Sequence, residues 1–140
     1  LFYFRHSVRK NNMDRTRAID HVTLTVSNLD RTKSFYEKLF QAKFTKHKGN
    51  SFHLLPVGIP VWFVQLEKQH PNDRFDETRI GLDHIAFHLE TLEELKKFVN
   101  RLIEMGIPTA GLQRYDGKFP YIAFRDPDNI QVEFFIPKEV

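Results

Sequence analysis

The chain has 140 residues, of which 41% are hydrophobic and 28% charged, which is enough apolar material for the core of one ordinary domain. The apolar runs stay well short of the roughly 18–20 residues that cross a bilayer. The chain has no Cys, which excludes disulfides, thiolate metal ligands and a thiol nucleophile and fits a reducing cytoplasm. The net charge is +3, but residues 1–17 hold five basic side chains and one acidic one, so the remainder is near −1 and predicts neither a nucleic-acid nor a membrane partner.

The first segment, residues 1–18, is interpreted as an extension of the domain. It shows no clear period, and residues 1–12 precede a Met at position 13 without the apolar core and small-residue cleavage site of a signal peptide. We expect a disordered or non-native extension, whose first twelve residues can be deleted with a change of only a few degrees in melting temperature.

The folded part contains one pattern twice. Residues 19–26 read I-D-H-V-T-L-T-V and residues 82–89 read L-D-H-I-A-F-H-L, and each is followed by apolar residues at helical spacing. The matching positions lie 63 residues apart throughout: His21 and His84, Leu29 and Leu92, Phe35 and Phe98, Leu39 and Leu102. This constant offset indicates two copies of one structural unit.

The first unit, residues 19–68, begins with a strand over 19–26, whose alternation places His21 on the face opposite its apolar residues. Ser27-Asn28 predicts the cap of a helix that ends near Phe40. Three strands are expected next, over 42–46, 51–56 and 60–66. The polar stretch 69–81 then reads as a linker.

The second unit, residues 82–136, repeats this order. A strand over 82–89 precedes a helix that Thr91 caps and Gly106 ends. A short strand over 107–109, a loop over 111–119 and a hairpin then follow, and the hairpin joins strands 121–125 and 130–136 across D-P-D-N. The predicted fold is α+β, with two tandem β-α-β-β-β modules forming one cupped, mostly antiparallel sheet around a cleft.

Side-chain direction predicts where the chemistry lies. In residues 60–66 we assign Trp62, Val64 and Leu66 to the helix side and Val61, Phe63 and Gln65 to the other. The face away from the helices then carries four groups that can bind a metal: His21, Gln65, His84 and Glu133. Two His and a carboxylate suit Fe(II), Mn(II), Ni(II), Co(II) or Zn(II). A single His in a strand is more often an ordinary surface residue, but here both repeats carry it at the same place.

The chain resembles the vicinal oxygen chelate superfamily, which includes glyoxalase I, extradiol dioxygenases, methylmalonyl-CoA epimerase, and fosfomycin- and bleomycin-resistance proteins. The resemblance rests on the two Asp-His strands, on S-F-Y-E-K-L-F, and most specifically on F-R-D-P-D-N-I-Q-V-E. It implies that His21, His84 and Glu133 bind one divalent transition metal. Gln65 takes the fourth place, with Glu67 as the alternative.

The resemblance also implies a small-molecule substrate that binds the metal through two neighbouring oxygens, and a homodimer. The two modules can form the cup within one chain or by exchange between chains. Lyase, isomerase or dioxygenase chemistry is expected, with Glu133 as the catalytic base. The alternatives are a metal-free binding protein of the bleomycin-resistance type and a fosfomycin-type thiol transferase. The expected substrate-binding residues are Thr23, Phe63, Tyr115, Tyr121 and Arg125, and a phosphonate would also require basic groups such as Arg114 and Lys118.

Overall fold

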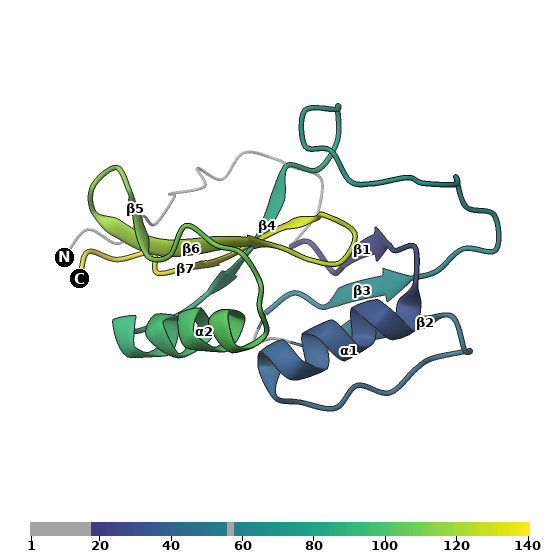
Figure 1. Cartoon of the computed structure of the whole chain (residues 1–140), viewed down its shortest axis with the longest axis horizontal. Coiled ribbons are helices and arrows are strands. Elements are labelled where there is room, and N and C mark those ends of the chain that lie inside the picture. The colour runs from purple at the N-terminus through teal and green to yellow at the C-terminus, as the bar shows by residue number, and fades with distance from the viewer. Residues whose placement is uncertain (1–17, 56–57) are drawn as a thin grey trace.

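The computed structural model describes residues 18–55 and 58–140, which form two similar units joined by a long loop (Figure 1). The first unit contains β1 (Val22–Thr25), α1 (Leu29–Phe40), β2 (Ser51–Leu54) and β3 (Val61–Val64). The second contains β4 (His84–His88), α2 (Leu92–Glu104), β5 (Gln113–Tyr115), β6 (Phe119–Arg125) and β7 (Gln131–Phe135). The predicted extension, apart from residue 18, lies outside the described residues.

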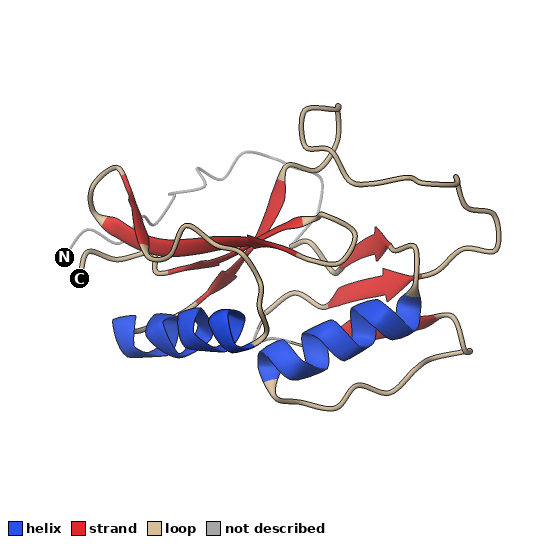
Figure 2. Ribbon diagram, viewed as in Figure 1, coloured by secondary structure: helices blue, strands red, loops and turns tan. Residues whose placement is uncertain are grey.

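Each unit contributes one sheet. The strand order is β1-β3-β2 in the first sheet and β4-β7-β6-β5 in the second. The first strand of each unit pairs in parallel with the last, β1 with β3 and β4 with β7, and the remaining pairs are antiparallel. Figure 2 shows both helices on the same side of the sheets. The predicted α+β class with two related modules is confirmed.

The two helices begin where the sequence predicts. The Asn28 side chain accepts a hydrogen bond from the Arg31 amide at 2.9 Å and so caps α1. Thr91 and Glu94 form a reciprocal capping box at the start of α2, which satisfies two amides that the helix leaves free. The left-handed backbone of Gly106 (φ 68°) follows the end of α2.

Two predicted strands and one predicted loop need correction. Residues 42–46 form no strand, because the Phe44 amide is taken by the Glu37 side chain at 2.9 Å and the Phe44 ring stacks on Phe52 instead. The first unit therefore reads β-α-β-β. The expected strand over 107–109 is reduced to a single bridge between Thr109 and Phe124. The expected loop over 111–119 contains β5, which adds an exposed edge strand to the second sheet.

The assignment of faces in β3 was also wrong. Val61 and Phe63 are buried, and the Phe63 ring lies 4.7 Å from the ring of Tyr36 in α1. Trp62 and Val64 are only partly buried and lie on the face away from α1. The helix sides of both sheets join in one hydrophobic core, whose fully buried aromatic residues include Tyr36, Phe52, Phe63 and Phe134.

The predicted linker, 69–81, contains no helix or strand. It is attached to the β6–β7 turn, where the Phe75 amide donates to the Asp128 carbonyl and the Asn129 side chain donates to the Phe75 carbonyl, at 3.0 and 2.8 Å. In the described part of the chain, neither helix is long and apolar enough to cross a membrane.

Candidate metal and substrate site

The second sheet presents its polar residues on the face away from the helices. The strand register places His84, Gln131 and Arg125 side by side in one row of that face. The next row on the same face is Ala86, Glu133 and Ala123. Since alternate residues of a strand share a face, this face carries the predicted ligands His84 and Glu133 together.

His84 and Glu133 lie close enough to bind one ion. Nε2 of His84 is 3.7 Å from Oε2 of Glu133, and the Glu133 side chain is only 13% exposed. Its cross-strand neighbours are both Ala, Ala86 on β4 and Ala123 on β6. A carboxylate that has lost most of its water requires a compensating donor or cation.

The two Asp-His pairs are built alike. In each, the Asp Oδ1 lies 2.6 Å from the His Nδ1, between Asp20 and His21 and between Asp83 and His84. A carboxylate on Nδ1 fixes the proton there and leaves Nε2 with a free lone pair. This is how metal-binding imidazoles are commonly oriented.

The first sheet does not repeat the carboxylate. Thr23 pairs with Trp62 in β3, as Ala86 pairs with Glu133 in β7, so Trp62 occupies the place that corresponds to Glu133. Gln65 lies beyond the end of β3, and its Oε1 accepts the Leu29 amide at 2.7 Å at the start of α1. The expectation that Gln65 faces the cleft is therefore wrong, and Glu67 is exposed further along the chain.

The first sheet carries a cluster of rings on the face away from α1, which the sequence does not predict. The ring of His53 in β2 lies against the ring of Trp62, tilted by 32° with the centroids 4.4 Å apart. His47 contacts both rings, at 5.0 Å from His53 and 5.2 Å from Trp62. Nδ1 of His53 is buried and has no hydrogen-bond partner among the described residues. The strand register is the signal that unites these rings, and the sequence alone does not supply it.

One chain does not assemble the predicted metal site by itself. Among residues 18–55 and 58–140, the His, Asp and Glu side chains nowhere form a group of three that could hold an ion. His84 and Glu133 meet in the second sheet, whereas His21 precedes β1 in the first.

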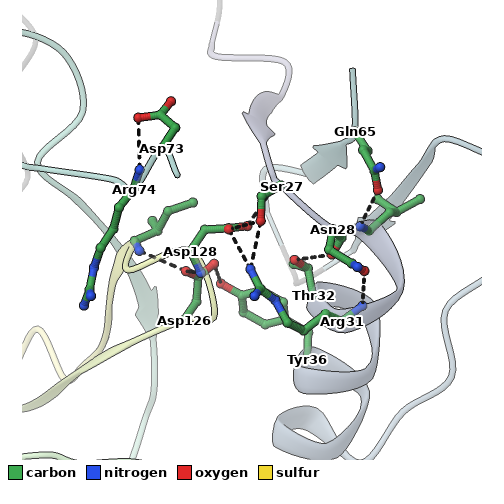
Figure 3. A network of polar contacts seen from close by, with 12 residues as sticks. Ser27, Asn28, Arg31, Thr32, Tyr36, Gln65, Asp73, Arg74, Asp126 and Asp128 are labelled. Carbon is green, nitrogen blue, oxygen red and sulfur yellow. Dashed lines mark hydrogen bonds and ion pairs between the residues drawn. The ribbon is translucent and has the colours of Figure 1, made fainter. Parts of the chain in front are cut away.

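A polar network joins the two units near the start of α1 (Figure 3). The Tyr36 hydroxyl in α1 donates to Oδ2 of Asp126 at 3.2 Å. Asp128, in the β6–β7 turn, accepts from the Ser27 amide at 3.0 Å, from the Ser27 hydroxyl, and from Arg31 at 2.8 Å. The network fixes how the first unit meets the second within the chain.

Burial changes the acidity of this network. Burial is the main cause that raises the pKa of Asp126, to about 6, against the opposing hydrogen bonds from the Ile130 and Asp128 amides. Burial and the neighbouring Asp126 together raise the pKa of Tyr36 well above 10. At neutral pH the contact between the units therefore contains a buried carboxylate.

The predicted substrate-binding residues divide into two groups. Thr23 lies on the cleft face beside Trp62, and Tyr121 lies on it beside Phe135, with ring centroids 6.4 Å apart. Tyr115 is 65% exposed on the edge strand β5. Phe63, by contrast, is a core residue and does not face the cleft.

The basic residues proposed for an anionic substrate are already engaged. Both terminal nitrogens of Arg125 donate to the Glu77 carboxylate, at 2.9 and 2.5 Å, and this contact holds the pKa of Glu77 at about 2. Arg114 donates to the carbonyls of Lys118 and Val140, and Lys118 pairs with Glu139. Arg114 also pairs with the buried Pro120, which places it on the face away from the cleft.

A cavity of about 290 Å³ lies at the other end of β1. It is bordered by Thr25 and Ser27, by the linker residues His70 and Arg74, and by Asp128 in the β6–β7 turn. The lining includes none of the four predicted metal ligands, so this cavity is separate from the candidate metal site.

Comparisons with known proteins agree with this fold. Residues 18–134 match the family model of the glyoxalase/bleomycin resistance protein/dioxygenase superfamily. The chain is 31% identical to metallothiol transferase FosB of Lysinibacillus sphaericus, covering 84% of this chain and 81% of that protein. It is 30% identical to a trivalent organoarsenical cleaving enzyme of a Bacillus species, over 84% and 72% of the two chains.

Two solved structures are similar in shape. One is a glyoxylase/bleomycin resistance protein/dioxygenase domain from Frankia, at 30% identity and a TM-score of 0.74, covering 86% of this chain and 98% of that one. The other is a variant of the fosfomycin resistance protein FosX from Listeria monocytogenes in complex with Mn(II), at 23% identity and a TM-score of 0.64, covering 86% and 90%; this likeness shows the fold alone. The chain belongs to the glyoxalase/bleomycin resistance protein/dioxygenase superfamily, the vicinal oxygen chelate superfamily.

Proposed function

We propose that the protein is a metal-dependent enzyme that binds a small organic substrate through neighbouring oxygens on one divalent transition metal. His21, His84 and Glu133 would hold the ion. The observation that carries the proposal is that Nε2 of His84 faces Oε2 of Glu133 at 3.7 Å while Asp83 holds Nδ1. The same Asp-His pair recurs before β1.

The donor set fits such an ion. Two neutral imidazoles and one carboxylate are typical ligands of Fe(II), Mn(II), Ni(II), Co(II) and Zn(II), and three protein ligands leave positions open. Trp62, at the place that corresponds to Glu133, offers no ligand atom, which supports three protein ligands and not the four predicted. The name of the FosB relative also refers to a metal.

We infer that the site forms between two chains. The network around Asp126 and Asp128 joins the two units near α1, and within one chain His21 does not join His84 and Glu133. A two-fold symmetric dimer in which modules are exchanged would add His21 of one chain to His84 and Glu133 of the other, and would cover both cleft faces. Each dimer would then hold two equivalent sites.

The residues around the ion would divide the work. A bound divalent metal would supply Lewis-acid stabilisation of negative charge that develops on the substrate oxygens. We assign to Glu133 the role of accepting a proton from the substrate, because it is the carboxylate on the cleft face of β7 and its cross-strand neighbours, Ala86 and Ala123, are small. Thr23 and Trp62 would contact the substrate from the first module, and Tyr121 from the second.

A fosfomycin-type thiol transferase is a second candidate. The similarity to FosB and the position of Thr23, two residues after His21, favour it. A phosphonate held by Arg125, Arg114 and Lys118 is less well supported, because all three side chains already have partners. Arg125 pairs with Glu77, Arg114 donates to Val140 and Lys118 pairs with Glu139. We therefore place the broader metal-dependent activity first.

Metal binding tests the proposal. Chain freed of metal with a chelator should bind about one Mn(II) per chain in calorimetry, and His84→Ala should abolish this binding. The control is His88→Ala, which removes an imidazole from the same face of the sheet. His88 is not a predicted ligand, and its Nε2 lies 3.1 Å from Oε1 of Glu90. Trp62 is the chain's single tryptophan, so paramagnetic ions should also quench its fluorescence. If Mn(II), Fe(II), Co(II), Ni(II) and Zn(II) all fail to bind, a metal-free ligand-binding protein replaces the enzyme.

A further inference from the structure

The orientation of Glu133 is set by a single neighbouring side chain. Nε2 of Gln131 donates to Oε1 of Glu133 at 3.1 Å. The other oxygen, Oε2, is the one that lies 3.7 Å from Nε2 of His84. The two carboxylate oxygens therefore have different roles, one held by an amide and one left toward the imidazole.

Among the described residues, Gln131 has no competitor for this role. The cross-strand neighbours of Glu133 are Ala86 and Ala123, whose methyl groups cannot donate a hydrogen bond. Gln131 itself is fixed between His84 on β4 and Arg125 on β6, two residues before Glu133 on the same face. Its backbone is paired with a neighbouring strand on each side, so the start of its side chain is placed by the sheet.

The chemistry of an amide suits this position. A Gln side chain donates without adding charge, so two neutral imidazoles and one carboxylate keep their total charge of −1 toward a divalent ion. Gln131 also restrains the carboxylate from rotating. The carboxylate is then already ordered before the ion binds, and the entropy cost of ordering it on binding is smaller.

We propose that Gln131 is a positioning residue that presents Oε2 of Glu133 to the metal, an inference that rests on the function proposed above. Without it, Glu133 can rotate about its terminal bond, and its two oxygens become equivalent toward the ion. Residues that orient metal ligands in this way typically change metal affinity by about 10–100-fold when they are replaced.

The test compares Gln131→Met, which keeps the length of the side chain and removes the donor, with Gln113→Met. Gln113 makes the matched control because it is an exposed Gln on the same sheet, in β5. Calorimetry with Mn(II) alone should show an affinity at least about tenfold weaker in Gln131→Met and unchanged in Gln113→Met. The electron paramagnetic resonance spectrum of the Mn(II)-loaded chain should also change in Gln131→Met, because the carboxylate geometry differs.

Three outcomes separate the two proposals. If the unaltered chain binds no Mn(II), the proposed function fails and the role of Gln131 fails with it. If the unaltered chain binds Mn(II) and Gln131→Met matches it in affinity and spectrum, only the positioning role is refuted. The melting temperatures of the metal-free chains should agree within a few degrees, and a large loss in Gln131→Met would instead indicate a structural role and overturn the inference.

Discussion

The buried Asp126 should make the protein less stable as the pH rises from about 4 to about 6. Burial raises its folded-state pKa from 3.8 to about 6, so the folded chain holds this proton more tightly than the unfolded chain. Stability from this group is complete below pH 4 and is lost as the pH passes 6. At 1.36 kcal/mol per tenfold change in proton affinity, the loss is about 3 kcal/mol.

Asp126→Asn isolates this effect. The Asn carbonyl oxygen can still accept the Asp128 and Ile130 amides, both now at 2.9 Å from Oδ1, and its amide can donate to the Tyr36 oxygen. The neutral side chain also removes repulsion from Asp128. We therefore expect Asp126→Asn to raise the free energy of unfolding by about 1–3 kcal/mol at pH 7.5 and to change it little at pH 4.

Urea unfolding at a fixed protein concentration, followed by Trp62 fluorescence, measures both values. Asp116→Asn is the control, because Asp116 is an exposed turn residue with a left-handed backbone that Asn also adopts. A difference between Asp126→Asn and the unaltered chain that is the same at pH 4 and pH 7.5 would refute the reasoning. So would a loss of stability at pH 7.5.

Two further predictions concern the Glu77–Arg125 pair and the buried Phe63. Glu77→Gln should make the stability of the chain fall less steeply as the pH is lowered from about 4.5 to about 2. The Arg125 contact lowers the pKa of Glu77 from 4.5 to about 2, so the stabilisation from the pair is lost as the pH falls through that range. Acid unfolding followed by circular dichroism measures this, and an unchanged curve in Glu77→Gln would show that the pair contributes nothing. Phe63→Ala should destabilise the chain by about 3–5 kcal/mol as a core residue, whereas Tyr115→Ala should change the stability by less than about 0.5 kcal/mol. Equal effects of these two substitutions in urea unfolding would contradict the assignment of Phe63 to the core.

The repeat predicted most of the fold because its signals are local. Apolar residues at helical spacing and capping residues define α1 and α2 whatever surrounds them, and both helices begin at the predicted residues. The faces of β3 could not be predicted in the same way. Its four residues, V-W-F-V, are all apolar, so no polar side chain marks the solvent side, and packing against Tyr36 decides.

Other features depend on partners that the sequence does not show. β5 consists of the polar residues Q-R-Y and becomes a strand only because β6 pairs with it. The Asp-His pairs mark both imidazoles in the sequence, and the structure confirms that His84 lies beside Glu133. Trp62 stands where a fourth metal ligand was expected, because the strand register pairs it with Thr23. Register depends on contacts between residues that are distant in the sequence, so the sequence alone does not supply it.

The central proposal, a metal site shared between two chains, is tested most directly by mixing two defective variants. His21→Ala and Glu133→Ala should each bind no Mn(II). After unfolding and refolding together, the mixed dimers should recover one site each, built from His21 of one chain and from His84 and Glu133 of the other. Calorimetry on mixed dimers isolated with two different affinity tags should therefore give about one Mn(II) per dimer. If confirmed mixed dimers bind no Mn(II), while the unaltered protein treated in the same way does, each chain builds its own site and the exchange is wrong.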